Sequence, residues 1–117
     1  MLHEPYVLDR TAREVVLAAL RQHCTWRGWN LLAAHVRSNH VHAIVEAEIR
    51  PERILVEFKA YASRELNRVG RDGPERKRWA RHGSTRWLRK DQDVIRALQY
   101  VIDEQGEPMA LFVTEEL

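Results

Sequence analysis

Two histidines separated by one residue, His40 and His42, form the pattern in this sequence with the clearest potential for chemistry. Residues 40–47 alternate between apolar and other side chains as a half-buried strand does, so both imidazoles are expected on one face of the strand. Two imidazoles on one pleated face can bind a single cation. The spacing therefore makes His40 and His42 candidate metal ligands; the alternative is an exposed strand face that simply carries two histidines.

A phenol and a carboxylate follow on the next expected element. Residues 50–68 have the pattern of a helix with Pro51 in its first turn, and Tyr61 and Glu65 stand one turn apart on it. A tyrosine beside a divalent metal can attack a phosphodiester, because the metal polarises the phosphate and the phenol can hold the cut strand covalently. Tyr61 is thus a candidate nucleophile and Glu65 a candidate third ligand. A packed tyrosine at the edge of the apolar stripe is the alternative.

Positive charge is concentrated in one part of a chain whose net charge is only +2. The stretch from Arg64 to Lys90 contains ten Lys or Arg and three Asp or Glu, so it carries +7 and the remainder carries −5. Cations alternate there with flat rings, which suits a phosphate backbone with stackable bases; a solvated loop with buried tryptophans is the alternative. The residues expected to contact nucleic acid are Arg64, Arg68, Arg76, Lys77, Arg78, Trp79, Arg81, Arg86 and Trp87.

The remaining elements form a scaffold around these residues. Thr11 has the spacing of a capping box for a first helix, which Gly28 ends. Strands are expected at 29–37 and 109–113 and a third helix at 91–103, with weaker strand patterns near 6–8 and 82–88. Strict alternation in 29–37 places Leu32, Ala34 and Val36 on one face and Leu31, Ala33 and His35 on the other.

Two more histidines are weaker candidates for a metal site. His35 is close to the pair in sequence, but it lies across a turn formed by Ser38 and Asn39, and alternation does not settle which way it faces. His23 falls on an apolar stripe of the first helix without a His, Asp or Glu one turn away, which favours a packed histidine.

Bulk properties set the outer limits. A chain of 117 residues is expected to form one domain, residues 1–117. The single Cys24 rules out an intramolecular disulfide framework, which favours an intracellular, cytoplasmic protein. No apolar run is long enough to cross a membrane and the N-terminus lacks the layout of a signal peptide, so no membrane partner is expected.

The order of elements resembles the one-tyrosine HUH transposases, the insertion-sequence-200-like family that includes the REP-associated tyrosine transposases. The likeness covers roughly residues 11–108 and rests on the segments SNHVHAIVEA, FKAYASRELN, WARHGSTRWL and LQYVIDEQGEP, the last of which is similar to that family's YI-x-x-NP ending. It implies a ferredoxin-like α+β fold, in which helices pack on an antiparallel sheet. It also implies magnesium or manganese on His40 and His42, and single-stranded DNA or DNA hairpins as substrate.

The resemblance further implies that Tyr61 becomes joined to the 5′ phosphate of cleaved DNA while a 3′ hydroxyl is released. As a separate hypothesis about the mechanism, Lys59 is expected to assist at the phosphate. A solvated lysine is the alternative for Lys59. The family's third ligand is usually Gln or Asn one turn after the tyrosine, where this chain has Glu65. Relatives often work as homodimers, some with the tyrosine helix of one subunit against the metal site of the other.

Two other functions compete with this interpretation. A domesticated transposase, catalytically weak or inactive, would act as a nucleic-acid-binding protein; Glu65 and the short N-terminal segment favour it, whereas His40, His42 and Tyr61 oppose it. An unrelated metal-dependent nuclease would use water as the attacking group and Tyr61 as a structural residue.

Overall fold

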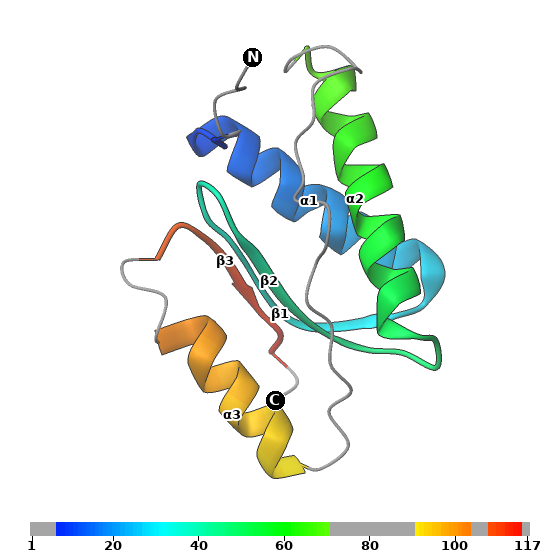
Figure 1. Cartoon of the computed structure of the whole chain (residues 1–117), viewed down its shortest axis with the longest axis vertical. Helices are drawn as coiled ribbons and strands as arrows, with labels where there is room; N and C mark the ends of the chain where they lie inside the picture. Colours follow the sequence, from blue (N-terminus) through cyan, green and yellow to red (C-terminus); the bar gives the residue numbers. More distant parts are fainter. Residues whose placement is uncertain (1–6, 71–90, 104–107, 116–117) are drawn as a thin grey trace, which may run out of the picture.

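The computed structural model describes residues 7–70, 91–103 and 108–115. Their elements follow in the order α1 (Arg10–Arg27), β1 (Asn30–Val36), β2 (Val41–Glu46), α2 (Pro51–Arg68), α3 (Asp91–Asp103) and β3 (Ala110–Val113) (Figure 1). The predicted α+β class, with helices packed on an antiparallel sheet, is confirmed. Val7 and Leu8 lie outside any strand, and the strand pattern near 82–88 falls outside the described residues.

Helix α1 begins earlier than the Thr11 pattern predicts. Asp9 is the N-cap, and its side-chain Oδ1 accepts a hydrogen bond from the Ala12 N–H at 2.8 Å. A carboxylate here satisfies one of the N–H groups left without a partner in the first turn, so Thr11 lies inside the helix instead of capping it. Gly28 ends the helix in the left-handed conformation, with φ of 75°, as expected.

The sheet has the order β2-β1-β3, with antiparallel pairing on both sides of β1. In the hairpin, His35 is opposite His42 and Val36 is opposite Val41. The register shifts between Leu31 and Ala33, which is the mark of a β-bulge. The predicted strict alternation is therefore wrong at the start of β1: Leu31 packs with the layer of Ala34 and Val36, and Leu32 packs with the layer of Ala33.

Helices cover both faces of this sheet (Figure 1). Helices α1 and α2 pack against each other, and their buried residues Val16, Leu20, Phe58 and Leu66 share a cluster with Ala34 and Val36 of β1. Helix α3 lies on the other face, where Leu98 and Val101 pack with Ala33 and Ile44. Since side chains alternate along a strand, this second face is also the one to which His35 and His42 belong. Within the described ranges, no helix is long and apolar enough to cross a bilayer.

Candidate functional site

The histidine pair lies where the β1–β2 hairpin turns back. His42 is the second residue of β2 and is half-buried, whereas His40 precedes the strand and is exposed. The two rings are nearly parallel, with an interplanar angle of 6° and centroids 6.1 Å apart. Val41 and Val45 pack with the opposite layer, so the predicted facing of the strand is confirmed.

The hydrogen bonding of His40 indicates which of its ring nitrogens keeps a lone pair. Its Nδ1 is 2.7 Å from Asn39 Oδ1, and because an amide oxygen only accepts, Nδ1 carries the proton. The Nε2 lone pair is then available for a cation. For His42, burial first and the neighbouring His40, His35 and Arg37 second lower the pKa, which favours the neutral, ligand-competent imidazole.

Tyr100 is the phenol that the structure brings to this pair. It lies on α3, and its ring meets the ring of His42 edge-on, with an interplanar angle of 83° and centroids 5.8 Å apart. The side chain is also exposed, so a substrate can reach it. Sequence reasoning did not select Tyr100, although it begins the YVIDEQGEP ending on which the family resemblance partly rests.

Tyr61 lies in the other layer of the molecule. Its ring centroid is 5.1 Å from that of His23 on α1, and its hydroxyl donates to Gln22 Oε1 at 3.4 Å. Tyr61 packs with the cluster that covers the Ala34 and Val36 face of the sheet, whereas His42 belongs to the α3 face. One chain therefore does not bring Tyr61 to the histidine pair.

Glu65 and Lys59 lie on α2 with Tyr61, and α2 packs on α1 and not on the face of the sheet that α3 covers. Glu65 accepts two hydrogen bonds from the Arg68 guanidinium, at 3.0 and 3.3 Å. Among the described residues, no group of three or more His, Cys, Asp or Glu side chains could hold a metal ion. The predicted set of His40, His42 and Glu65 is thus not assembled within one chain, because α2 packs on α1 away from the α3 face.

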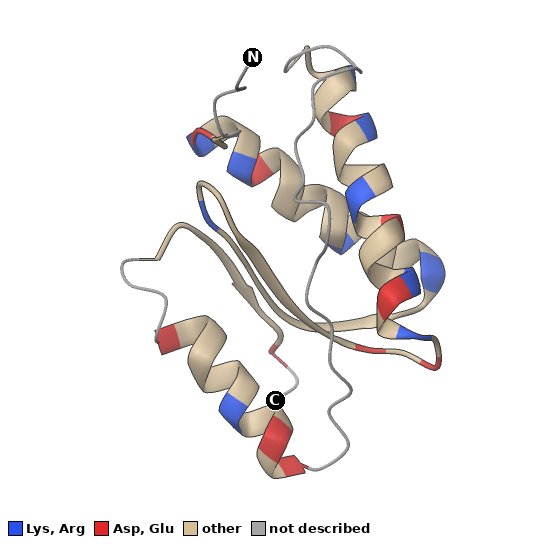
Figure 2. Cartoon of the chain, viewed as in Figure 1, with Lys and Arg blue, Asp and Glu red and all other residues tan. Residues whose placement is uncertain are grey.

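Of the cations expected to contact DNA, the structure describes two. Arg64 and Arg68 are exposed on α2, where basic and acidic residues alternate along the helix (Figure 2). The ion pair with Glu65 occupies the guanidinium of Arg68. Arg76, Lys77, Arg78, Trp79, Arg81, Arg86 and Trp87 lie outside the described residues.

His35 is wholly buried between β1 and α3 and serves neither as a surface residue nor as a ligand. Its Nδ1 donates to the Val101 carbonyl at 3.2 Å, and its Nε2 accepts the Met109 N–H at 2.9 Å. Burial, the largest influence, lowers its pKa. With one nitrogen donating and the other accepting, the ring is neutral and has no lone pair left for a cation.

His23 contacts Glu57 in a cluster of polar side chains that joins α1 to α2. Its Nε2 is 2.7 Å from Glu57 Oε1, and Arg27 donates two hydrogen bonds to the same carboxylate, of 2.9 and 2.7 Å. Arg53 adds a further hydrogen bond to Glu57 Oε2 at 2.9 Å. The contact with Arg27 first, and those with His23 and Arg53, hold the pKa of Glu57 at about 2. His23 is buried, as the prediction of a packed histidine requires. Its acidic partner Glu57 lies on α2 and not on the helix that carries His23.

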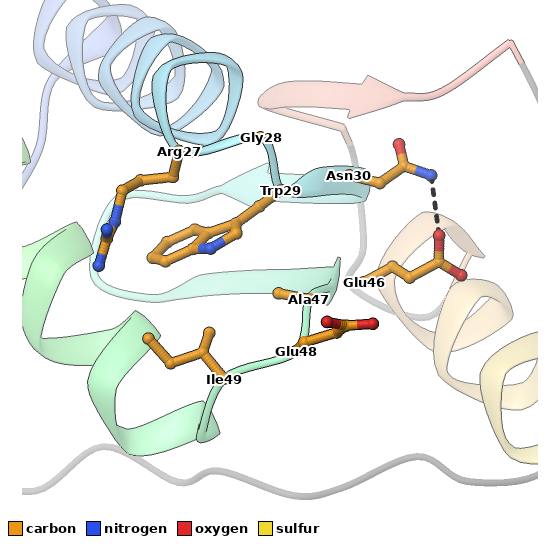
Figure 3. Close-up of a pocket in the computed structure, with 8 residues that line it drawn as sticks. All are labelled: Arg27, Gly28, Trp29, Asn30, Glu46, Ala47, Glu48 and Ile49. Atoms are coloured by element: carbon orange, nitrogen blue, oxygen red, sulfur yellow. Dashed lines mark hydrogen bonds between the residues drawn. The ribbon is translucent and has the colours of Figure 1, made fainter.

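A hollow of about 570 Å³ opens where α1 leads into β1. Trp29 projects into it between Arg27 and Ile49, and the Arg27 guanidinium carbon lies 5.2 Å from the centroid of the Trp29 ring (Figure 3). The hydrogen bond from Asn30 Nδ2 to Glu46 Oε1 closes another side of it. The lining contains none of the residues predicted for catalysis or metal binding, so this hollow is distinct from the histidine pair.

Comparison with known proteins identifies one family. Residues 4–90 match the family model described as "Transposase IS200 like", a range that includes His40, His42 and Tyr61 and ends before α3. Searches of curated proteins and of solved structures found no match.

Proposed function

We propose that this chain, which belongs to the family of IS200-like transposases, is a metal-dependent endonuclease and strand transferase for single-stranded DNA, with Tyr100 as its nucleophile. Family membership supports DNA as the substrate and transposition as the process. The edge-on contact of the Tyr100 ring with His42, on the face of the sheet that α3 covers, is the observation that carries the choice of nucleophile.

His40 and His42 are the proposed ligands of the divalent metal. Their rings are nearly parallel, and His40 Nδ1–H donates a hydrogen bond to Asn39 Oδ1. Both observations support this assignment. Magnesium takes oxygen ligands, so a site containing two imidazoles favours manganese among the two expected metals. When bound, the cation would polarise the scissile phosphate and neutralise its charge. With Tyr100 as nucleophile, the family's ligand one turn later would fall at Glu104, outside the described residues.

In the proposed reaction, Tyr100 Oη attacks the scissile phosphorus in line with the departing oxygen. The bond between phosphorus and the 3′ oxygen breaks, the phenol proton passes to solvent, and the 3′ oxygen takes a proton from solvent and leaves as a hydroxyl. The 5′ phosphate stays joined to Tyr100. A later 3′ hydroxyl attacks this phosphotyrosine and reseals the strand, so the bond energy is kept without a nucleotide cofactor.

Tyr61 is a second candidate nucleophile only in an assembly of two chains. In such a homodimer, α2 of one chain would lie against the histidine pair of the other. The contacts of Tyr61 with His23 and Gln22 of its own chain favour a structural role. Its side chain must leave these contacts before it can reach the histidine pair of a second chain. Glu65 and Lys59 share its helix and would depend on the same arrangement.

The test is covalent capture of short single-stranded DNA hairpins with manganese, followed by denaturing electrophoresis and mass spectrometry. We expect an adduct on Tyr100 that EDTA abolishes, that persists in Tyr61→Phe, and that is absent in Tyr100→Phe while DNA binding is retained. An adduct mapped to Tyr61 would instead support the two-chain arrangement. Cleavage without any adduct would indicate attack by water, and binding without cleavage would indicate a nucleic-acid-binding protein without nuclease activity.

A further inference from the structure

His35 connects three parts of the molecule through one buried ring. Its side chain starts from the central strand β1, donates from Nδ1 to Val101 O on α3, and accepts at Nε2 from the Met109 N–H just before β3. Both bonds span long stretches of sequence, and both reach backbone groups. The ring therefore fixes the position of backbone atoms, and does so independently of the side chains that Val101 and Met109 carry.

The bond to Val101 falls at a place where a helix needs an external partner. The last four carbonyl groups of a helix have no N–H donor within the helix, and α3 ends at Asp103. Val101 is buried, so water is a poor substitute for a donor. His35 Nδ1–H supplies that donor. Leaving a buried carbonyl without a donor destabilises the fold, so this contact is a strong constraint on the last turn of α3.

The constrained turn is the one that carries Tyr100. Val101 is its neighbour in the chain, and His35 is the cross-strand partner of His42. The ring of His35 thus links the backbone beside Tyr100 to the strand position opposite His42. A rotation of α3 about its axis, or a slide along the sheet, would break the bond to Val101 O and move Tyr100 relative to His42.

We propose that His35 is a positioning residue that holds Tyr100 against the histidine pair through its bond to the Val101 carbonyl. This inference rests on the proposed role of Tyr100. His35 itself touches neither the substrate nor the metal, because it is buried and both of its nitrogens are occupied. It acts on the rate of attack through the geometry of α3.

The test compares His35→Leu, His35→Asn and the control Val36→Ala. Leucine removes both hydrogen bonds, whereas the asparagine amide can still donate from the place of Nδ1. Val36 is the next residue of β1 and is buried in the opposite layer, so Val36→Ala weakens the same strand without touching α3. The measurements are the rate of adduct formation at saturating DNA, the Kd for DNA, and the nuclear Overhauser contact between the Tyr100 and His42 rings.

We expect His35→Leu to slow adduct formation about 10- to 100-fold at saturating DNA, since a misplacement of about 1 Å has effects of this order. Its Kd should stay near that of the wild type and its ring-to-ring contact should weaken. His35→Asn should recover most of the rate, and Val36→Ala should keep it despite a lower melting temperature. A folded His35→Leu variant with the wild-type rate and ring contact would overturn the proposal.

Two further outcomes separate this inference from the proposed function. If His35→Leu does not fold, the rates of adduct formation in His35→Asn and His35→Gln are compared instead. Glutamine places its amide near the position of Nε2, so it should not restore the bond to Val101. A faster Gln variant than Asn variant would contradict the positioning role. If Tyr100→Phe retains the adduct, the nucleophile assignment fails; the ring contact in His35→Leu then still shows whether His35 positions α3.

Discussion

A single hydrogen bond determines which nitrogen of His40 carries the proton and which keeps its lone pair. Asn39 Oδ1 accepts from His40 Nδ1, and this arrangement fixes the tautomer and limits rotation of an otherwise exposed ring. The turn between β1 and β2 thus does more than reverse the chain. From sequence, Asn39 was expected only to shape that turn, because the partner of an amide side chain is not visible in a pattern of residue types.

Replacing Asn39 with alanine should weaken manganese binding about 10- to 100-fold, the usual effect of removing a partner that orients a metal ligand. Isothermal titration with manganese measures the affinity directly. Ser38→Ala, the neighbouring residue of the same turn, is the control and should retain the wild-type affinity. An Asn39→Ala variant that binds manganese as tightly as the wild type would show that His40 needs no such support.

The sequence does not show which of Tyr61 and Tyr100 lies near the histidine pair. Residue types and local spacing predicted that His40 and His42 share a strand face, and the structure confirms it. The same spacing does not show which face of the sheet each helix covers, because that depends on long-range connections. Tyr61 has the favourable neighbours in sequence, whereas Tyr100 has the favourable neighbour in space.

Among the elements, α1 and α2 are joined by the cluster around Glu57. Its carboxylate, largely shielded from solvent, accepts from His23 and Arg27 of α1 and from Arg53 one turn earlier on α2. A shielded carboxylate that accepts from two arginines stabilises the fold while it is ionised, because protonation removes the charge that the guanidinium groups match.

Acid should therefore destabilise this helix pair in a defined range. The folded pKa of Glu57 is about 2, below the ordinary value of 4.5, so between these values the unfolded chain binds more protons than the folded one. Its contribution to the free energy of unfolding is complete above pH 4.5 and disappears as the pH falls towards 2. Glu57→Gln should be less stable at pH 7 and should flatten this part of the stability profile, measured by urea unfolding at each pH.

The control for this experiment is Glu14→Gln. Glu14 forms an exposed pair with Arg10 at 3.7 Å, and such surface pairs contribute little to stability. Its profile should follow that of the wild type. A Glu57→Gln profile as steep as that of the wild type would mean that other carboxylates carry the acid sensitivity.

Element boundaries were predictable wherever the signal was local. The helix at 91–103 and the end of α1 at Gly28 agree with the pattern of residues, as does α2 after Pro51. The start of α1 was missed because Asp9 and Thr11 are both good caps, and sequence alone does not rank them. The bulge in β1 was missed because an inserted residue leaves the composition of the strand unchanged.

Across the whole molecule, positive charge is distributed unevenly. The stretch from Arg64 to Lys90 carries +7 in a chain of net charge +2, and it joins α2 to α3. Binding of such a stretch to DNA phosphates releases counterions, so it strengthens the affinity for all sequences and makes that affinity sensitive to salt.

Replacing Arg76, Lys77 and Arg78 with alanine should weaken binding to single-stranded DNA by a similar factor for unrelated sequences. The slope of log K against log salt should become shallower by about 0.7 for each phosphate that the variant no longer neutralises. Fluorescence anisotropy over a salt series measures both quantities. Arg10→Ala, remote in sequence from this stretch, is the control; an unchanged slope in the triple variant would place the DNA-binding surface elsewhere.

The position of α3 in the sequence also bears on the order in which the proposed site is assembled during synthesis. The hairpin with its two histidines and the helices α1 and α2 lie within residues 10–68, whereas Tyr100 and the neighbouring Val101, whose carbonyl accepts from His35, emerge much later. Domains generally fold as units during synthesis, so the hairpin reaches its final packing only after α3 and β3 have emerged. On the proposed assignment, a chain that ends before α3 contains both histidines but no nucleophile. Such a truncated chain would then be unable to break a DNA strand.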